Sequence, residues 1–217
     1  MNAYSLSSNP SAINVRWFLS IGLVLLVIVI DQALKFYVKT HFSLHEEVEI
    51  TSWFRLHFTE NKGMAFGMDF IGTAFLTTFR LLVIGFFVWG LIKAQKQLLP
   101  MGFIACLSLI VAGALGNIID NCFYGEIFTE SLLWGSPASL TAFGEGYGAF
   151  LEGKVVDMFY FPLFTWPESI PFVGGDIFFG AIFNFADAAI SCGAVALILF
   201  YYKYITHLTD SNPTIDA

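Results

Sequence analysis

WFLSIGLVLLVIVIDQALKFYV, residues 17–38, is an apolar run long enough to cross a lipid bilayer as a helix, which takes about 20 residues. It contains no Ala-x-Ala-like site, so we expect a retained span and not a cleaved secretion signal. Three further runs are Thr73–Ile92, Met101–Ile119 and Ala181–Tyr202. Of the 217 residues, 12% are charged, about half the share in a soluble domain. The sequence predicts an all-α integral membrane protein with four transmembrane helices in a single membrane domain, residues 1–217.

Basic residues predict the orientation of these spans, because Lys and Arg in short connections stay on the cytoplasmic side. Arg16 precedes the first span, Lys93 and Lys96 lie between the second and third, and Lys203 lies at the end of the fourth. In a four-span arrangement, all of these positions are on one side of the membrane. Both termini are then cytoplasmic, and the connections at about residues 41–72 and 121–180 lie outside. We expect a small sheet in the first of these connections, because side chains alternate over Trp53–Thr59. In the second, Lys154–Met158 is a strand-like apolar run. Glu60–Gly63 predicts a turn.

Charge and ligand spacing argue against several classes of partner. The net charge is −7, and neither a basic cluster nor a Gly-rich phosphate loop is present, so we do not expect nucleic acid to bind. Cys106, Cys122 and Cys192 lack ligand spacing, and the four histidines lack the i, i+4 zinc pairing. We therefore expect neither a metal nor a cofactor.

Polar side chains follow one helical face in three of the predicted spans. They are Asp31 and Lys35 in the first, Gly113, Asn117 and Asp120 in the third, and Asn184, Asp187 and Ser191 in the fourth. With the predicted orientation all of them fall in the outer leaflet. An ionisable side chain in hydrocarbon costs at least about 2.5–3.5 kcal/mol, so each needs a partner or a function. The sequence predicts a shared polar site just below the outer surface.

Each of these residues also has a structural interpretation. Asp31 and Lys35 are one turn apart and predict an ion pair. Asn117 and Asn184 fit hydrogen bonds between helices as well as contacts to a substrate. Asp120 fits a role in orienting its neighbours. A lone aspartate at position 157 is typical of a turn or a helix cap. Asp157 becomes a candidate catalytic residue only if it pairs with Asp187.

A pair of aspartates would hydrolyse a peptide bond without a metal. Two carboxylates about 3 Å apart cannot both ionise, so one is a base and the other an acid at neutral pH. The sequence has no Gly-x-Ser-x-Gly or His-Glu-x-x-His motif. A serine–lysine mechanism stays open on composition, although Asp31 accounts better for Lys35. Two alternatives are a proton-coupled transporter that relays protons through the intramembrane aspartates, and a noncatalytic assembly factor in which they join helices.

Five sequence blocks, in order, resemble the signatures of the lipoprotein signal peptidases (signal peptidase II). They are Asp31-Gln32-x-x-Lys35, Phe58-Thr59-Glu60-Asn61-Lys62-Gly63-Met64-Ala65-Phe66-Gly67, Gly113-Ala114-Leu115-Gly116-Asn117-Ile118-Ile119-Asp120, Val155-Val156-Asp157-Met158 and Phe183-Asn184-Phe185-Ala186-Asp187. The resemblance implies four membrane helices, an extracytoplasmic β-cradle and a periplasmic segment that closes over the site.

The resemblance also implies a reaction. Asp157 and Asp187 would be the catalytic pair of an aspartic endopeptidase that cuts diacylglyceryl prolipoproteins on the amino side of the lipobox cysteine. The enzyme would lie in the bacterial cytoplasmic (inner) membrane among lipids, with its site toward the periplasm. Globomycin-type inhibitors would bind near Asn61, Gly63, Asn117 and Asn184. The implied substrate-binding or supporting residues are Asp31, Lys35, Asn61, Gly63, Gly113, Asn117, Asp120, Asn184 and Ala186.

Two features depart from the family pattern. Asn121 stands where members commonly have an arginine, and a long insert at about residues 122–154, expected on the periplasmic side, separates the third and fourth blocks. A cation near a carboxylate pair helps to keep one member ionised. We therefore hypothesise that Lys154, the basic residue of this connection, replaces the missing arginine near Asp157.

Overall fold

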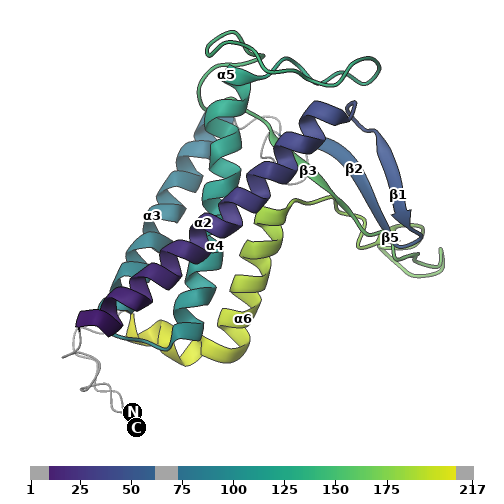
Figure 1. The fold of residues 1–217 in the computed structure, drawn as a ribbon. Helices are drawn as coiled ribbons and strands as arrows, with labels where there is room; N and C mark the ends of the chain where they lie inside the picture. The colour runs from purple at the N-terminus through teal and green to yellow at the C-terminus, as the bar shows by residue number, and fades with distance from the viewer. Residues whose placement is uncertain (1–9, 62–72, 209–217) are drawn as a thin grey trace. The chain divides into compact units, whose positions relative to one another are not determined.

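The computed structural model describes residues 10–61 and 73–208, which belong to two compact units (Figure 1). The helical unit comprises Met1–Ile30, Phe79–Gly116 and Ala186–Ala217, and the sheet unit comprises Asp31–Thr78 and Asn117–Phe185. The predicted single membrane domain stays a prediction.

Helices form at all four of the apolar runs. They are α2 (Pro10–His41), α3 (Thr73–Lys96), α4 (Met101–Ile119) and α6 (Phe185–His207). Within the described residues, three helical segments are long and apolar enough to cross a membrane: Ile13–His41, Met101–Ile127 and Phe185–Ile205. Helix α3 is not one of these three, so the count of four spans stays a prediction.

The helical unit has one core, built by α3, α4 and the chain around the end of α6. The buried residues of this core are Leu91, Ala94, Leu99, Phe103, Ile104, Leu107, Val111 and Leu208. The outward-facing side chains of α2, α3 and α6 are also apolar, and Phe18, Leu82 and Phe200 are among the most exposed of them. Helices that are apolar on all sides are typical of membrane spans, because lipid, unlike water, is a good solvent for the outward face.

The sheet unit contains the small sheet that the sequence predicts. Strands β1 (Glu47–Thr51), β2 (Phe54–Asn61) and β3 (Val155–Tyr160) are antiparallel in the order β1-β2-β3. Phe58, Val156 and Met158 are buried in the core below it. Beyond β3, the short strands β4 (Phe164–Thr165) and β5 (Ile177–Phe178) form a separate hairpin.

The prediction of a turn at Glu60–Gly63 is wrong for its first two residues, Glu60 and Asn61. Strand β2 continues through Glu60 and Asn61, because they pair with Val156 and Val155 of β3. Gly63 lies outside the described residues.

The helix of the third span also runs further than expected. The π-helix η2 (Asp120–Tyr124) and the short helix α5 (Gly125–Ile127) continue α4 (Figure 1). The other end of the insert, at Gly153, lies beside Asn121 near its beginning. The backbone N–H of Gly153 donates to the Asn121 carbonyl at 2.9 Å, and the Asn121 side-chain amide donates to the Gly153 carbonyl at 2.8 Å. Asn121, in the position of the usual arginine, thus closes the base of the insert.

Candidate active site

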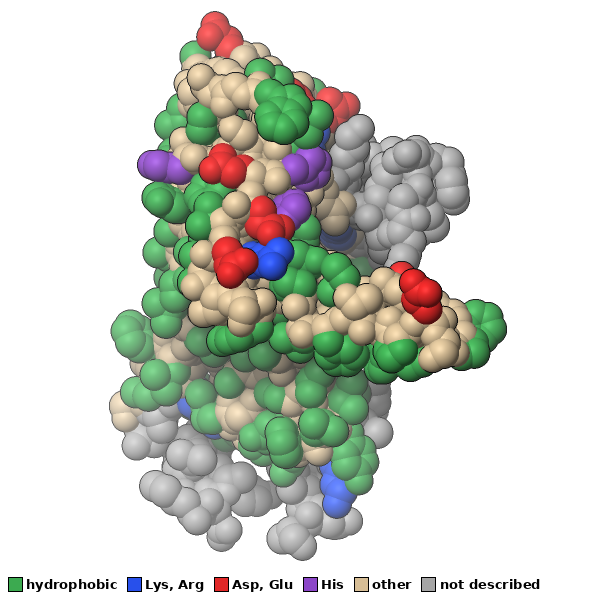
Figure 2. All heavy atoms as spheres, turned by 90° about the vertical axis from the view of Figure 1, so that its right-hand side faces the viewer, with side chains coloured by type: hydrophobic (Ala, Val, Ile, Leu, Met, Phe, Trp, Pro, Cys, Tyr) green, Lys and Arg blue, Asp and Glu red, His purple; other side chains and the backbone are tan. Residues whose placement is uncertain are grey.

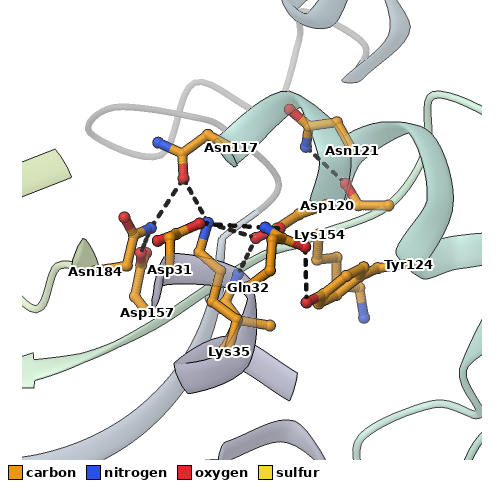
Figure 3. A network of polar contacts seen from close by, with 12 residues as sticks. Asp31, Gln32, Lys35, Asn117, Asp120, Asn121, Tyr124, Lys154, Asp157 and Asn184 are labelled. Atoms are coloured by element: carbon orange, nitrogen blue, oxygen red, sulfur yellow. Dashed lines mark hydrogen bonds and ion pairs between the residues drawn. The ribbon is translucent and has the colours of Figure 1, made fainter. Parts of the chain in front are cut away.

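Lys35 lies at the centre of a buried polar network in the sheet unit (Figure 3). Its ammonium is 2.9 Å from a carboxylate oxygen of Asp31 and 2.9 Å from one of Asp120, and all three side chains are fully buried. The ion pair predicted between Asp31 and Lys35 is confirmed. Asp120 was predicted to belong to this polar site, but its ion pair with Lys35 was not, because no spacing rule relates residues 35 and 120.

Gln32 and β3 hold the carboxylates of this network in place. The Gln32 amide donates to Asp120 at 2.8 Å and to Asp31 at 3.1 Å, while the Tyr124 hydroxyl donates to the Gln32 carbonyl oxygen at 3.2 Å. The backbone N–H of Val156 donates to the other oxygen of Asp120 at 3.2 Å. Asp120 opens the π-helix η2, a distortion that is frequent at functional sites, and it therefore joins that segment to β3.

Two asparagines extend the network from Lys35 to Asp157. The Lys35 ammonium donates to the Asn117 carbonyl oxygen at 2.8 Å. The same oxygen accepts a hydrogen bond of 3.1 Å from the Asn184 amide, which also donates to Asp157 at 2.7 Å (Figure 3). Asn117 and Asn184 therefore do bond across elements, one of the two alternatives left open by the sequence.

Local structure explains why Asp157 and Asn184 meet. Asp157 lies in the middle of β3, between Val156 and Met158, and only 4% of it is exposed. The next residue but one, Phe159, forms an antiparallel bridge with Phe183. Because Asn184 follows Phe183, the bridge brings its side chain beside β3.

Three of the other predicted site residues are in the helical unit. Gly113 of α4 packs against the start of α6, where an added Cβ would be 2.2 Å from the Ala186 carbonyl oxygen. Gly113 and Ala186 thus share a close helix contact. Asp187 is half-buried in the first turn of α6, where the helix dipole favours a negative charge. Its pairing with Asp157 stays a prediction. In the sheet unit, Asn61 is exposed at the end of β2.

A second ionic cluster joins the insert to β2, and sequence reasoning missed it. The ammonium of Lys39, fully buried, binds the Glu60 carboxylate and donates to the Ser131 hydroxyl at 3.0 Å. Ser131 in turn donates to Glu60 at 2.7 Å. The available signal was the position of Lys39, one turn beyond Lys35 on the same face of α2.

Lys154 belongs to this second cluster. Its ammonium binds Glu130, lies 3.4 Å from Glu60 and sits 5.0 Å from the centre of the Tyr147 ring. Burial alone would lower the pKa of Lys154, but the hydrogen bond that it donates to Glu130 and the negative charge of Glu60 raise this pKa overall. The hypothesis that Lys154 replaces the arginine at Asp157 is wrong. Lys154 lies just before β3 and its ammonium is taken up by Glu130 and Glu60, whereas the cation in the Asp157 network is Lys35.

The arrangement offers carboxylate chemistry. Through residues 10–61 and 73–208, no group of three or more His, Cys, Asp or Glu side chains is placed to hold a metal ion. Of the buried carboxylates in the network, that of Asp157 accepts a hydrogen bond from the Asn184 amide, whose orientation is fixed by Asn117 and Lys35. Such a carboxylate suits proton transfer, for which a defined position matters as much as basicity.

Comparison with known proteins places this arrangement in context. Residues 23–203 match the family model described as signal peptidase (SPase) II. The chain is 43% identical over 199 residues to the lipoprotein signal peptidase of Porphyromonas gingivalis, covering 89% of this chain and 87% of the relative. It is 34% identical over 192 residues to that of Amoebophilus asiaticus, covering 82% and 75%. A solved bacterial membrane enzyme has a similar fold, with a TM-score of 0.56, 21% identity and coverage of 89% of this chain and 93% of that one.

Proposed function

This chain belongs to the signal peptidase II family of membrane proteases, and from that membership we propose that it is an intramembrane aspartic endopeptidase. Its substrates would be diacylglyceryl-modified prolipoproteins, cut on the amino side of the lipobox cysteine. The observation that supports this best is the buried Asp157 carboxylate on β3, held at 2.7 Å by Asn184. The family's processing of lipoproteins fits a chain with three candidate membrane spans in its described residues.

We assign the catalytic pair to Asp157 and Asp187. The chain itself supports this pairing, since only two residues lie between Asn184 and Asp187, which limits their Cα atoms to about 11 Å apart. Asn184 is hydrogen-bonded to Asp157, so Asp187 is within reach of the same substrate.

In the proposed reaction, the ionised aspartate takes a proton from water as the water oxygen attacks the scissile carbonyl carbon. The protonated aspartate gives its proton to the carbonyl oxygen, which forms a neutral tetrahedral diol. As the C–N bond breaks, the first aspartate returns a proton to the leaving amine and the second recovers one from a diol hydroxyl. Both carboxyl groups then have their original protonation, and neither metal nor covalent intermediate is required.

The Lys35 network would position Asp157 for this chemistry. Asn184 can present its NH₂ group to Asp157 only if its carbonyl oxygen points away. The Asn117 oxygen imposes this orientation, because it accepts from Asn184 and is itself fixed by Lys35. The network therefore prevents the amide of Asn184 from flipping.

The substrate would enter from the lipid phase, because its cysteine already carries diacylglycerol. We place the site toward the periplasmic side of the inner membrane, with both chain termini in the cytoplasm. Asn61, Gly63, Asn117 and Asn184 would lie along the bound peptide and along globomycin-type inhibitors. Asp31, Lys35, Gly113, Asp120 and Ala186 would support the site.

The proposal is tested with the purified full chain in detergent. A diacylglyceryl prolipoprotein should be cut, and the same precursor without diacylglycerol should not. Chelators should leave the rate unchanged; loss of activity in chelator that zinc restores would instead indicate metal-dependent hydrolysis.

A further inference from the structure

The segment that leaves β3 exposes an unusual number of apolar side chains (Figure 2). Seven of them, each more than a third exposed, lie between residues 163 and 179: Leu163, Phe164, Phe172, Val173, Ile177, Phe178 and Phe179. Monomeric proteins rarely present a contiguous apolar patch of this kind to water, and such patches mark contacts with proteins or membranes.

The segment is a folded hairpin. Phe164 pairs with Phe178 and Thr165 with Ile177. Beyond these pairs, the N–H of Trp166 donates to the Asp176 carbonyl at 2.9 Å, which extends the hairpin toward its tip. Its apolar side chains are therefore held outward by a defined backbone.

Backbone strain at the tip points to a functional requirement. Phe172 has a φ of 70°, in the left-handed region that bulky side chains rarely adopt, and its side chain is fully exposed. Strained conformations of this kind persist where the surrounding structure maintains them, and they gather at functional positions. Here the strained residue projects an aromatic ring away from the protein.

Ring contacts connect the hairpin to the beginning of a membrane span. Phe164 contacts Phe178 with ring centres 4.8 Å apart, Phe178 contacts Phe179 at 6.5 Å, and Phe179 contacts Phe183 at 5.9 Å. Phe183 is two residues before Phe185, where the candidate span Phe185–Ile205 begins. The chain of ring contacts thus leads from the hairpin to the start of this candidate span.

The charge of the hairpin and the chain around it indicates how the hairpin would attach to a membrane. From residue 155 to residue 202 the sequence contains no Lys or Arg, while the hairpin carries Glu168 and Asp176. Anionic headgroups would therefore not attract it. Aromatic rings, in contrast, favour the headgroup level of a bilayer of any charge.

From these observations we propose that the β4–β5 hairpin docks on the lipid bilayer that contains α6, with the aromatic ring of Phe172 among the headgroups. The exposed apolar side chains, the strained aromatic tip and the absence of Lys and Arg from residues 155–202 all favour a bilayer surface as the partner. The hairpin would then be a second attachment of the sheet unit to the membrane, additional to the spanning helices.

Spin-label accessibility in proteoliposomes tests this proposal without relying on proteolysis. Cys192 is exposed and Cys106 and Cys122 are buried, so labels are placed in a Cys192→Ser background. Phe172→Cys and Leu163→Cys probe the hairpin, and Glu49→Cys on the exposed face of β1 is the matched control. Relaxation by oxygen, which concentrates in lipid, is compared with relaxation by a water-soluble nickel chelate.

We expect the ratio of oxygen to nickel relaxation to be clearly higher at both hairpin positions than at position 49. The ratio should be the same in phosphatidylcholine vesicles and in vesicles that also contain phosphatidylglycerol. A label at position 172 that is as accessible to nickel as the label at position 49 would overturn the proposal. So would a label shielded from both reagents, which would indicate a protein cover such as a second copy of the chain.

Discussion

Lys35 balances two buried carboxylates, so its loss should harm stability more than the loss of either aspartate. Lys35→Met removes the ammonium that neutralises Asp31 and Asp120 in a fully buried site, and breaking a buried pair in this way costs about 3–5 kcal/mol. Asp31→Ala should cost less, because Asp120 still neutralises the ammonium. Unfolding midpoints in detergent measure the difference. A stable, abundant but inactive Asp31→Ala protein would instead indicate that Asp31 and Lys35 take part in the reaction and do not only stabilise the fold.

Asn184 should affect turnover more than folding. Asn184→Leu keeps the size of the side chain but removes the donor to Asp157 at 2.7 Å. A hydrogen bond to a charged group is worth about 1.5–3 kcal/mol, which corresponds to about a 10-fold to 100-fold loss of kcat if the bond positions Asp157 for reaction. Steady-state kinetics should show this loss in kcat with a smaller change in KM. Unchanged kcat in folded Asn184→Leu protein would remove Asn184 from the positioning role.

Helices α4 and α6 approach closely at Gly113, so an added methyl group there should separate them. The Cβ of Gly113→Ala would lie 2.2 Å from a backbone oxygen, which cannot move without shifting α6. Overpacking of this kind costs about 1–3 kcal/mol. The matched control is Gly85→Ala in α3, where no atom lies within 4 Å of the new Cβ and Ala favours the helix. Equal unfolding midpoints for the two variants would contradict the close contact.

The insert is fastened to β2 by the cluster around Glu60. Glu60→Gln leaves the buried ammonium of Lys39 without a carboxylate, and we expect a loss of about 3–5 kcal/mol in unfolding free energy. Glu49→Gln, an exposed position on β1, should change stability by less than about 0.5 kcal/mol. Limited proteolysis of the insert should accelerate in Glu60→Gln alone. Equal cleavage of both variants would show that this cluster does not hold the insert.

Local patterns in the sequence predicted the elements of the molecule better than their contacts. The apolar runs located all four long helices, and the strand-like run around Asp157 located β3, because both signals are periodicities within one segment. Helical structure beyond Ile119 was missed, although no Gly or Pro interrupts the chain before Gly125. The β4–β5 hairpin was also missed, since its strands contain only two residues each.

For the polar network around Lys35, the sequence predicted several member residues but few of the contacts between them. The one-turn spacing of Asp31 and Lys35 is a local signal, and the pair formed as expected. Asp120 joins them from 85 residues further along the chain, a partner that depends on how the segments pack. The Lys154 hypothesis was wrong for a related reason, because its closeness in sequence to Asp157 did not reveal that its ammonium binds Glu130 and Glu60.

The pairing of Asp157 with Asp187 is the central claim, and cleavage by purified variants tests it most directly. Asp157→Asn and Asp187→Asn each retain the size and shape of the side chain but cannot exchange the proton that the reaction needs. Cleavage of a diacylglyceryl prolipoprotein is measured for both variants and the wild type, with unfolding midpoints as the control for folding. We predict that each variant unfolds as the wild type does and shows no detectable cleavage. Turnover close to that of the wild type in either variant would contradict the assignment of the catalytic pair.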